Sequence, residues 1–271
     1  MRQAAIPLLS DEAFARITAL VYQQSGIVLA AHKKEMVISR LTRRLRELQL
    51  PDFNAYCDLV LRDSEEIGFL VNAITTNLTR FFREPHHFEH LRDTCLRPRL
   101  SQGSSDKRLR IWSAGCSKGA EAYSIAMVLA DCLQSHAGWD AKILATDIDT
   151  TMIAHSISGV YRQEEMKTVP AAYRRLIEPS GEQVQMPQSL QSLITFKPLN
   201  LLEDWPMRGL FDAIFCRNVV IYFDKPTQRQ LFSRLRTYLK PDGFLYVGHS
   251  ESLAQVSQEF KLIGKTIYRP V

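Results

Sequence analysis

Hydrophobic and polar residues in the first quarter of the chain recur with the period of an α-helix. The segment SDEAFARITALVYQQSG has a serine before two acids and ends at Gly26, which predicts a capped helix. A second helix is predicted from about residue 32 to 49, and a break at Leu50-Pro51-Asp52 follows it. Its apolar residues fall on one face: Val37, Leu41, Leu45 and Leu48. The segments PDFNAYCDLVLRD and SEEIGFLVNAI add two more helical patterns, so a small all-α domain is expected over residues 1–76.

The pattern changes after about residue 107 to short apolar runs that alternate with amphipathic stretches. The predicted strands are RLRIWSAG, AKILATDID, FDAIFCRNVVIYF and GFLYVGHS, the last one after a turn at residues 240–243. The predicted helices between them include GAEAYSIAMVLADCLQ and PTQRQLFSRLRTYL. This alternation predicts an α/β fold with a doubly wound parallel sheet and helices on both faces. Residues 157–195 interrupt it and are expected to form a small inserted subdomain.

Composition is that of a globular protein, with 45% hydrophobic and 23% charged residues among 271. No apolar segment approaches the roughly 18 to 20 residues that span a bilayer, and the start lacks a signal-peptide pattern. A cytoplasmic protein is therefore expected. The five cysteines are scattered and include no Cys-x-x-Cys, which favours reduced thiols. The glycosylation sequon at Asn77 then lacks the secreted context that it needs.

Positive charge is concentrated in the second predicted helix. Six basic residues against one acid lie between positions 33 and 46, and Arg40, Arg43 and Arg46 are expected on its polar face. One interpretation is a docking surface for an acidic helix, and the other is an ordinary solvated face. Nucleic acid is not expected as a partner, because no aromatic-rich basic strand face accompanies these arginines.

Ligands of doubly wound sheets bind where the parallel strands end, so the residues that follow each predicted strand are candidates for a site. The first strand runs into the turn at residues 113–119, and Glu121 lies in the helix after it. The second ends at Asp147, a candidate for holding ribose hydroxyls. Neither a dinucleotide fingerprint nor a P-loop is present, and Glu121 disfavours a phosphate. S-adenosylmethionine, which carries a sulfonium and no phosphate, fits this turn, although an ordinary tight turn stays an alternative.

Several motifs resemble, in order and spacing, those of the CheR family of chemotaxis receptor methyltransferases. They are TTNLTRFFRE, WSAGCSKGAEAYS, ATDID, NLL, FDAIFCRNVVIYFDK and LKPDGFLYVGHSE. The resemblance covers nearly the whole chain and implies a Rossmann-like methyltransferase sheet with an inserted antiparallel β subdomain after an all-α N-terminal domain. The implied reaction moves a methyl group from S-adenosyl-L-methionine to glutamate side chains on the cytoplasmic helical bundle of chemoreceptors. The implied products are glutamate methyl esters, used in sensory adaptation, and S-adenosyl-L-homocysteine.

The resemblance also implies domain boundaries and site residues. Residues 1–76 would dock on the receptor, 77–91 would link to the cofactor site, and 92–271 would form the methyltransferase domain. Cofactor contacts are implied at nine positions: Asn77, Thr79, Arg83, Glu121, Asp147, Asn200, Leu201, Arg217 and Asn218. Tyr222 matches the aromatic residue beside the reacting centre, and Arg83 is expected to share the catalytic role. Family members often have two acids after the motif glycine, whereas the first position here is Ala120.

Partners are expected to be chemoreceptors, with the insert as a candidate site for a receptor C-terminal peptide and a monomer as the default state. Phe81 and Phe82 are expected to separate, one ring at the domain junction and the other in the pocket. The histidines His86, His87 and His90 invite a metal, but no further ligand at a convincing spacing accompanies them and sulfonium chemistry needs none. No metal site is therefore predicted.

The chemistry needs little acid–base assistance. A glutamate side chain, with a pKa of about 4.3, is already ionised at neutral pH, so proximity and desolvation dominate. Arg83 or Arg217 is a candidate for orienting the incoming carboxylate, and a salt bridge from Arg83 to Glu84 is the structural alternative. Tyr222 is either a hydrogen-bond donor there or a core residue. A methyltransferase for RNA or a small molecule, and a non-catalytic cofactor-binding module, stay open as other functions.

Overall fold

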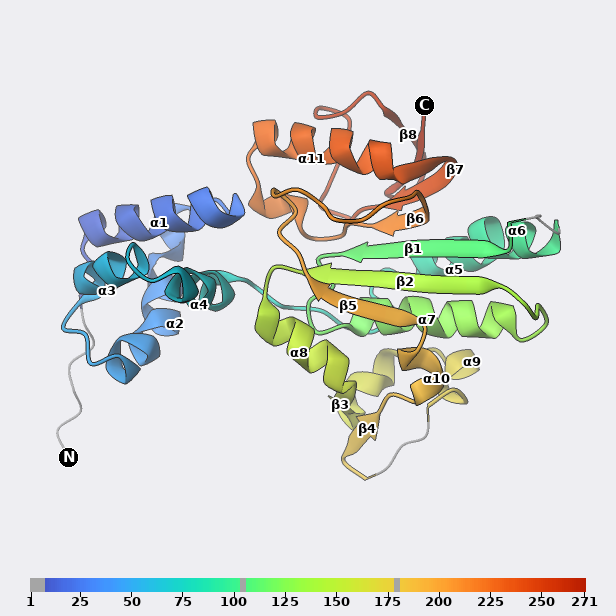
Figure 1. Cartoon of the computed structure of the whole chain (residues 1–271), viewed down its shortest axis with the longest axis horizontal. Coiled ribbons are helices and arrows are strands. Elements are labelled where there is room, and N and C mark those ends of the chain that lie inside the picture. Colours follow the sequence, from blue (N-terminus) through green and yellow to red (C-terminus); the bar gives the residue numbers. More distant parts are fainter. Residues whose placement is uncertain (1–7, 103–105, 178–180) are drawn as a thin grey trace. The chain divides into compact units, whose positions relative to one another are not determined.

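The structure is a computed structural model that describes residues 8–102, 106–177 and 181–271 (Figure 1). The chain divides into two compact units. The first comprises Met1–Thr76 and Tyr222–Asp224, and the second comprises Asn77–Ile221 and Lys225–Val271. The start of the predicted helical domain (1–7) and part of the predicted insert (178–180) lie outside the described residues.

Four α-helices build the first unit, as the hydrophobic pattern predicts. They are α1 (Asp11–Ser25), α2 (Lys34–Glu47), α3 (Phe53–Val60) and α4 (Ser64–Ile74), with a 3-10 turn at Ala31–Lys33. Ser10 caps α1 by accepting a hydrogen bond from the amide of Ala13, and Gly26 ends it in the left-handed region. The aspartates Asp52 and Asp63 cap α3 and α4. Such caps stabilise a helix by about 1 kcal/mol each.

A seven-stranded sheet forms the centre of the second unit, in the order β5-β2-β1-β6-β7-β9-β8 (Figure 1). Its strands are β1 (Arg108–Ala114), β2 (Asp140–Asp147), β5 (Ile194–Pro198), β6 (Phe211–Phe215), β7 (Leu239–Tyr246), β8 (Phe260–Gly264) and β9 (Ile267–Pro270). The five strands from β5 to β7 are parallel, so the predicted α/β class is confirmed. The antiparallel hairpin β8–β9 was not predicted, because β8 buries only Phe260 and has no alternating pattern.

The turn predicted at residues 240–243 is wrong, because these residues belong to β7. Leu239 pairs with Phe211 and Phe244 pairs with Ala213, so the register between β6 and β7 shifts across the segment between them. Pro241 cannot donate a backbone hydrogen bond, which suits an irregular stretch of strand. The turn signal therefore marks an irregularity within the strand rather than its beginning.

Helices pack against the sheet. The helices are α5 (Pro85–His90), α6 (Arg97–Ser101), α7 (Ala120–Leu133), α8 (Thr150–Ser158) and α11 (Lys225–Tyr238), with a π-helical turn at Leu91–Leu96. Most of α7 is buried, as expected for a helix between a sheet and further packed elements. Trp112 is fully buried, and its indole N–H donates to Thr146 Oγ1 at 2.9 Å, which ties β1 to β2.

The segment after α8 forms a small antiparallel pair, β3 (Val160–Arg162) with β4 (Gln183–Gln185). A 3-10 turn at Gln163–Thr168 and the short helices α9 (Ala171–Arg174) and α10 (Gln188–Gln191) accompany it. Tyr161 Oη donates to the carbonyl of Lys118 at 2.5 Å, so this segment is anchored to the turn after β1.

Phe81 and Phe82 do not separate as expected. Both are buried in one core cluster of the second unit. The ring of Phe81 meets Tyr161 edge-on at a centroid distance of 4.9 Å, and the ring of Phe82 stacks on Tyr173 at 5.1 Å. Two consecutive aromatic side chains reach the same core because Phe82 adopts a positive φ of 51°. Among the described residues, no helix is long and apolar enough to cross a bilayer.

Candidate functional site

The turn between β1 and α7 depends on three residues in the left-handed region. Gly115 and Gly119 both have φ of 83°, and Ser117 has φ of 48°. A Cβ atom at Gly115 would lie 2.3 Å from Val219 Cγ2, and one at Gly119 would lie 2.7 Å from Ser156 Oγ. Glycine is therefore required at both positions by space as well as by φ. The two glycines bring this backbone close to the loop after β6 and to α8.

Asp147 ends β2 beside that turn and is only 8% exposed. Its Oδ2 accepts a hydrogen bond from the amide of Ser117 at 2.7 Å, and its Oδ1 accepts one from the amide of Asp149 at 2.9 Å. Burial raises the pKa of Asp147 to about 6, although these amides oppose the shift. Each carboxylate oxygen can accept a second hydrogen bond, so the group can still hold two hydroxyls.

Asn77 begins the second unit and joins these groups. Its Nδ2 donates to Asp149 Oδ2 at 2.8 Å, and its Oδ1 accepts from Ser117 Oγ at 3.2 Å. The linker segment is thereby fastened to the ends of β1 and β2. Thr79 lies two residues on and is half-buried.

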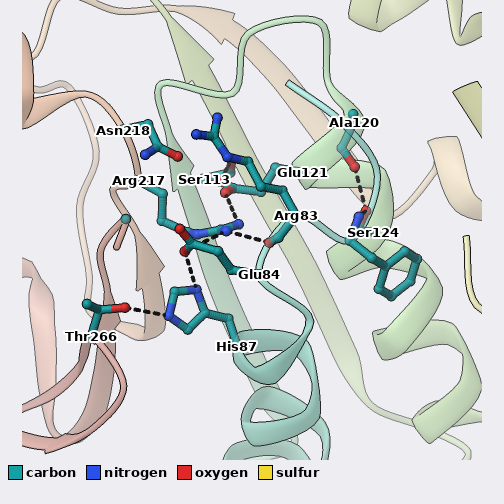
Figure 2. Close-up of polar contacts among 12 residues, drawn as sticks. Arg83, Glu84, His87, Ser113, Ala120, Glu121, Ser124, Arg217, Asn218 and Thr266 are labelled. Atoms are coloured by element: carbon teal, nitrogen blue, oxygen red, sulfur yellow. Dashed lines mark hydrogen bonds and ion pairs between the residues drawn. The ribbon is translucent and has the colours of Figure 1, made fainter. Parts of the chain in front are cut away.

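Arg217, at the end of β6, is the centre of a buried charge network (Figure 2). Its Nη1 donates to Glu121 Oε2 at 2.9 Å, and its Nη2 donates to Glu84 Oε2 at 2.9 Å and to the carbonyl of Arg83. The other oxygen of Glu121 accepts from Ser113 Oγ at 2.7 Å. Both terminal nitrogens of Arg217 are thus engaged by protein carboxylates. These contacts favour Arg83 over Arg217 as the candidate for orienting a substrate carboxylate, a role that stays a prediction.

Arg83 does not pair with Glu84, so the salt bridge considered as an alternative is wrong. Its Nη1 donates to the carbonyl of Leu78 at 3.0 Å, and in Figure 2 its guanidinium points away from the Glu84 carboxylate. Glu84 bonds to His249 instead, through the backbone amide at 2.9 Å and Nδ1 at 2.8 Å. Burial opposes ionisation of Glu84, but the amide of His249 and the charge of Arg217 hold its pKa at about 2.

The loop after β6 carries Asn218, a predicted cofactor residue, with φ of 59°. Its backbone amide donates to Glu251 Oε2 at 2.8 Å, and its side chain lies against Gly248. Sequence reasoning assigned no site role to Glu84, which it considered only as a partner of Arg83, or to Glu251. Each ends one of the motifs on which the family resemblance rests, TTNLTRFFRE and LKPDGFLYVGHSE, and that position was the available signal.

Asn200 and Leu201 lie in the turn after β5. The side chain of Asn200 accepts from the amide of Leu202 at 3.0 Å and donates to Glu203 Oε1 at 3.0 Å. Arg234 on α11 donates to the carbonyl of Leu201 at 3.2 Å. The turn is therefore held by its own side chains and by α11.

The three histidines that invited a metal interpretation bond to other parts of the sheet unit. His86 and His87 both contact the carbonyl of Lys265, and His90 Nδ1 lies 3.0 Å from the hydroxyl of Tyr246. Across the described parts of the chain, no group of three or more His, Cys, Asp or Glu side chains is arranged to hold a metal ion. These histidines fasten α5 to the sheet.

Tyr222 belongs to the compact unit of the four helices. Its carbonyl accepts a hydrogen bond from the amide of Val28 at 2.9 Å, and Tyr22 Oη donates to Asp224 Oδ2 at 2.7 Å. The side chain of Tyr222 is half-buried, so it is not a fully enclosed core residue.

The three arginines predicted on the polar face of α2 differ from one another. Arg40 donates to three carbonyls at the end of α4, those of Ala73, Ile74 and Thr75, at 2.6 to 3.2 Å. Arg40 therefore packs against the end of α4, although the helical pattern groups it with Arg43 and Arg46 on the polar face. Arg43 is 88% exposed in its side chain and pairs with Glu47, and Arg46 is also exposed.

The polar side chains at the strand ends fit S-adenosylmethionine. Asp147 can accept hydrogen bonds from two ribose hydroxyls, and the acidic environment of Glu121 and Glu84 suits an ammonium group. The two glycines leave room for a ligand to approach the backbone after β1. The buried Nε of Arg217 has no hydrogen-bond partner in the described part of the chain, so the site retains one donor.

Comparison with known proteins agrees with this chemistry. Residues 77–269 match the family model "CheR methyltransferase, SAM binding domain", and residues 12–75 match "CheR methyltransferase, all-alpha domain". The chain is 46% identical to a chemotaxis protein methyltransferase of Klebsiella aerogenes, covering 96% of this chain and 90% of that protein. It is 45% identical to the chemotaxis protein methyltransferase of Escherichia coli, with coverage of 96% and 91%. The chain therefore belongs to the CheR family of S-adenosylmethionine-dependent chemotaxis protein methyltransferases.

Proposed function

We propose that this protein methylates glutamate side chains of chemoreceptors and thereby forms glutamate methyl esters. The observation that carries the proposal is the grouping of Asp147, Glu121 and Arg217 at the carboxyl ends of β1, β2 and β6. That grouping is acidic and suits a cofactor without phosphate. The relatives at 45% and 46% identity are themselves named chemotaxis protein methyltransferases.

The cofactor site comprises the nine residues implied by the family motifs. Asp147 accepts hydrogen bonds from the ribose hydroxyls, and Glu121 binds the ammonium group of the cofactor. Arg217 holds the Glu121 carboxylate in place. Three of the others come from the segment 77–91 (Asn77, Thr79 and Arg83), two from the turn after β5 (Asn200 and Leu201), and Asn218 comes from the loop after β6. When bound, the cofactor supplies an electrophilic methyl group on a sulfonium that leaves readily.

Catalysis by the protein consists of positioning. The substrate carboxylate is already ionised, so the chain must strip it of water and align one oxygen in line with the methyl carbon. Arg83 orients that carboxylate through a charge-assisted hydrogen bond. Arg83 suits this role because only one of its donors has a protein partner among the hydrogen bonds of the described residues. For Tyr222, the role of a hydroxyl donor in the transfer rests on the family motif alone.

Receptor recognition is assigned to the helical region. Residues 1–76 are the proposed docking domain, 77–91 the segment that leads into the cofactor site, and 92–271 the methyltransferase domain with its insert at about 157–195. Residues 77–91 belong to the second compact unit and Tyr222–Asp224 to the first, so these boundaries hold only approximately. The two family models meet between residues 75 and 77, which supports the first boundary. Arg43 and Arg46 are exposed on α2 and attract an acidic receptor helix, whereas Arg40 maintains the fold.

The insert offers a second contact for a receptor. A cavity of about 810 Å³ lies against the 3-10 turn at Gln163–Thr168. Met166, Val169, Ile177 and Val184 give it an apolar lining. Lys167 pairs with Glu164 in the lining at 3.6 Å, and Arg174 adds a positive charge. This combination suits a C-terminal peptide with an apolar side chain and a terminal carboxylate. Because the proposed substrate is a cytoplasmic region of a receptor, we infer that the enzyme acts in the cytoplasm, with a monomer as the default expectation.

One assay tests the activity. Purified protein is incubated with S-adenosylmethionine labelled in its methyl group and with membranes that contain chemoreceptors. Label should appear in the receptor and should be released by mild alkali, because carboxyl methyl esters hydrolyse under conditions that spare N-methyl and ribose methyl groups. Alkali-stable label would indicate another acceptor, and cofactor binding without any transfer would indicate a non-catalytic binding module.

A further inference from the structure

We propose that Glu251 is a positioning residue of the methyl-transfer site, whose buried carboxylate fixes the loop after β6 and with it the side chain of Asn218. The proposal rests on the role proposed above for Asn218 in cofactor binding. Glu251 itself acts through the loop and contacts neither cofactor nor substrate.

Four backbone amides donate to this one carboxylate. Oε2 accepts from the amides of Asn218 at 2.8 Å and Gly248 at 2.6 Å. Oε1 accepts from the amides of Val220 at 2.9 Å and Ile221 at 3.3 Å. Glu251 is only 4% exposed. A carboxylate has about four acceptor positions, so its capacity is used entirely by the loops.

The loop needs such an acceptor because it turns away from the sheet immediately after β6. Asn218 has φ of 59°, in the left-handed region that few non-glycine residues adopt. Its amide and those of Val220 and Ile221 bond to Glu251 rather than to a neighbouring strand. Buried amides without acceptors are destabilising, so the Glu251 carboxylate holds the loop in this conformation.

Gly248 completes the arrangement. A Cβ atom there would lie 2.4 Å from Asn218 Nδ2 and 3.0 Å from the Asn218 backbone nitrogen. The side chain of Asn218 therefore occupies the space that any other residue at 248 would fill. The amide of Glu251 donates to the carbonyl of Gly248 at 2.9 Å, which closes the same turn. Gly248 and Glu251, which both follow β7, thus fix the direction of the Asn218 side-chain amide.

The test compares two buried carboxylates with equal exposure. Glu251→Gln replaces one carboxylate oxygen, an acceptor for the loop after β6, by an amide nitrogen. The control Asp212→Asn makes the same change at the other end of β6. Asp212 is also 4% exposed; it accepts from the Arg110 amide and pairs with two basic side chains, Arg99 and Lys240. Titration calorimetry with S-adenosylmethionine and the melting temperature are measured for both. We expect Glu251→Gln to raise the Kd by about tenfold or more, and Asp212→Asn to lower only the melting temperature.

Two further variants keep the outcome decisive. Gly248→Ala leaves Glu251 intact, displaces the Asn218 side chain and should raise the Kd in the same way, even if Glu251→Gln folds poorly. A wild-type Kd in Gly248→Ala, or in a folded Glu251→Gln, while Asn218→Ala binds weakly overturns the positioning role alone. A wild-type Kd in Asn218→Ala overturns the proposed cofactor contact itself, and the positioning role with it.

Discussion

Arg217 donates to Glu121 at 2.9 Å with both side chains almost completely buried, at 2% and 11% exposure. The same guanidinium holds Glu84, so one cation serves two carboxylates that come from α7 and from the linker. Taking charges out of water is costly, and such a group is stable only when every member keeps its partners. The network therefore makes the geometry of the cofactor site dependent on Arg217.

Replacement of Arg217 by alanine should be strongly destabilising, because it leaves Glu121 and Glu84 buried without a counter-charge. We expect the free energy of unfolding to fall by about 3–5 kcal/mol, measured by urea denaturation. Arg175→Ala is a suitable control, since Arg175 is 54% exposed and pairs with Asp131 at the surface. That control should lose less than about 1 kcal/mol. Equal losses in the two variants would show that the buried network does not form in solution.

Cofactor affinity should depend on pH through Asp147. Burial raises its pKa to about 6, so below that pH the native protein carries a proton that a ribose-binding carboxylate must lose. Because its pKa is higher in the folded protein, Asp147 stabilises the fold fully below its unfolded pKa of about 3.9. This stabilisation is lost as the pH rises through about 6. Calorimetry from pH 5 to 7.5 should therefore show tighter binding of S-adenosylmethionine at the higher values. Asp147→Asn should bind weakly and without this dependence, whereas a pH-independent Kd in the wild type would refute the assignment.

Substitution of Arg40 should affect stability, whereas substitution of Arg43 and Arg46 should affect receptor methylation. Arg40→Ala removes three hydrogen bonds to the end of α4 and should lower the free energy of unfolding by about 1.5–3 kcal/mol. Arg43→Glu with Arg46→Glu should leave stability and cofactor affinity unchanged. The rate of receptor methylation by this double variant should fall instead. The fall should be largest at low salt, because salt screens the attraction between exposed charges. Equal methylation by the double variant and the wild type at low salt would exclude α2 as the docking surface.

Local signals predicted most of the elements. Ser10 and Gly26 mark the ends of α1 through capping chemistry that involves residues three or four positions away. Asp147 was recognised because it ends an apolar strand. Glu121 was recognised because it follows a small-residue turn, although its partner Arg217 is 96 residues distant.

The residues that sequence reasoning missed or misjudged depend on distant partners. Arg40 is grouped with the docking arginines by helical periodicity alone, because its acceptors at the end of α4 lie 33 to 35 residues away. Glu84 and His249 are 165 residues apart, and Glu251 serves a loop about 30 residues before it. No periodicity or spacing in one sequence connects such pairs. Glu251 reaches the loop after β6 only because β6 and β7 are neighbours in the sheet.

Arg83→Ala should abolish methyl transfer with little effect on stability. The side chain of Arg83 is half-buried and donates to a single backbone carbonyl, that of Leu78, so its removal costs the fold about one hydrogen bond. Loss of the group that orients the substrate carboxylate should lower kcat/KM for receptor by about a hundredfold or more. Arg80→Ala, which changes an exposed arginine three residues away, is the matched control and should retain activity. Arg83→Lys keeps the charge but loses the planar fork, so it should restore only part of the rate. Near-normal turnover in Arg83→Ala would mean that the segment from Asn77 to Glu84 shapes the site through Asn77 and Glu84 alone, and that the substrate carboxylate is oriented without an arginine.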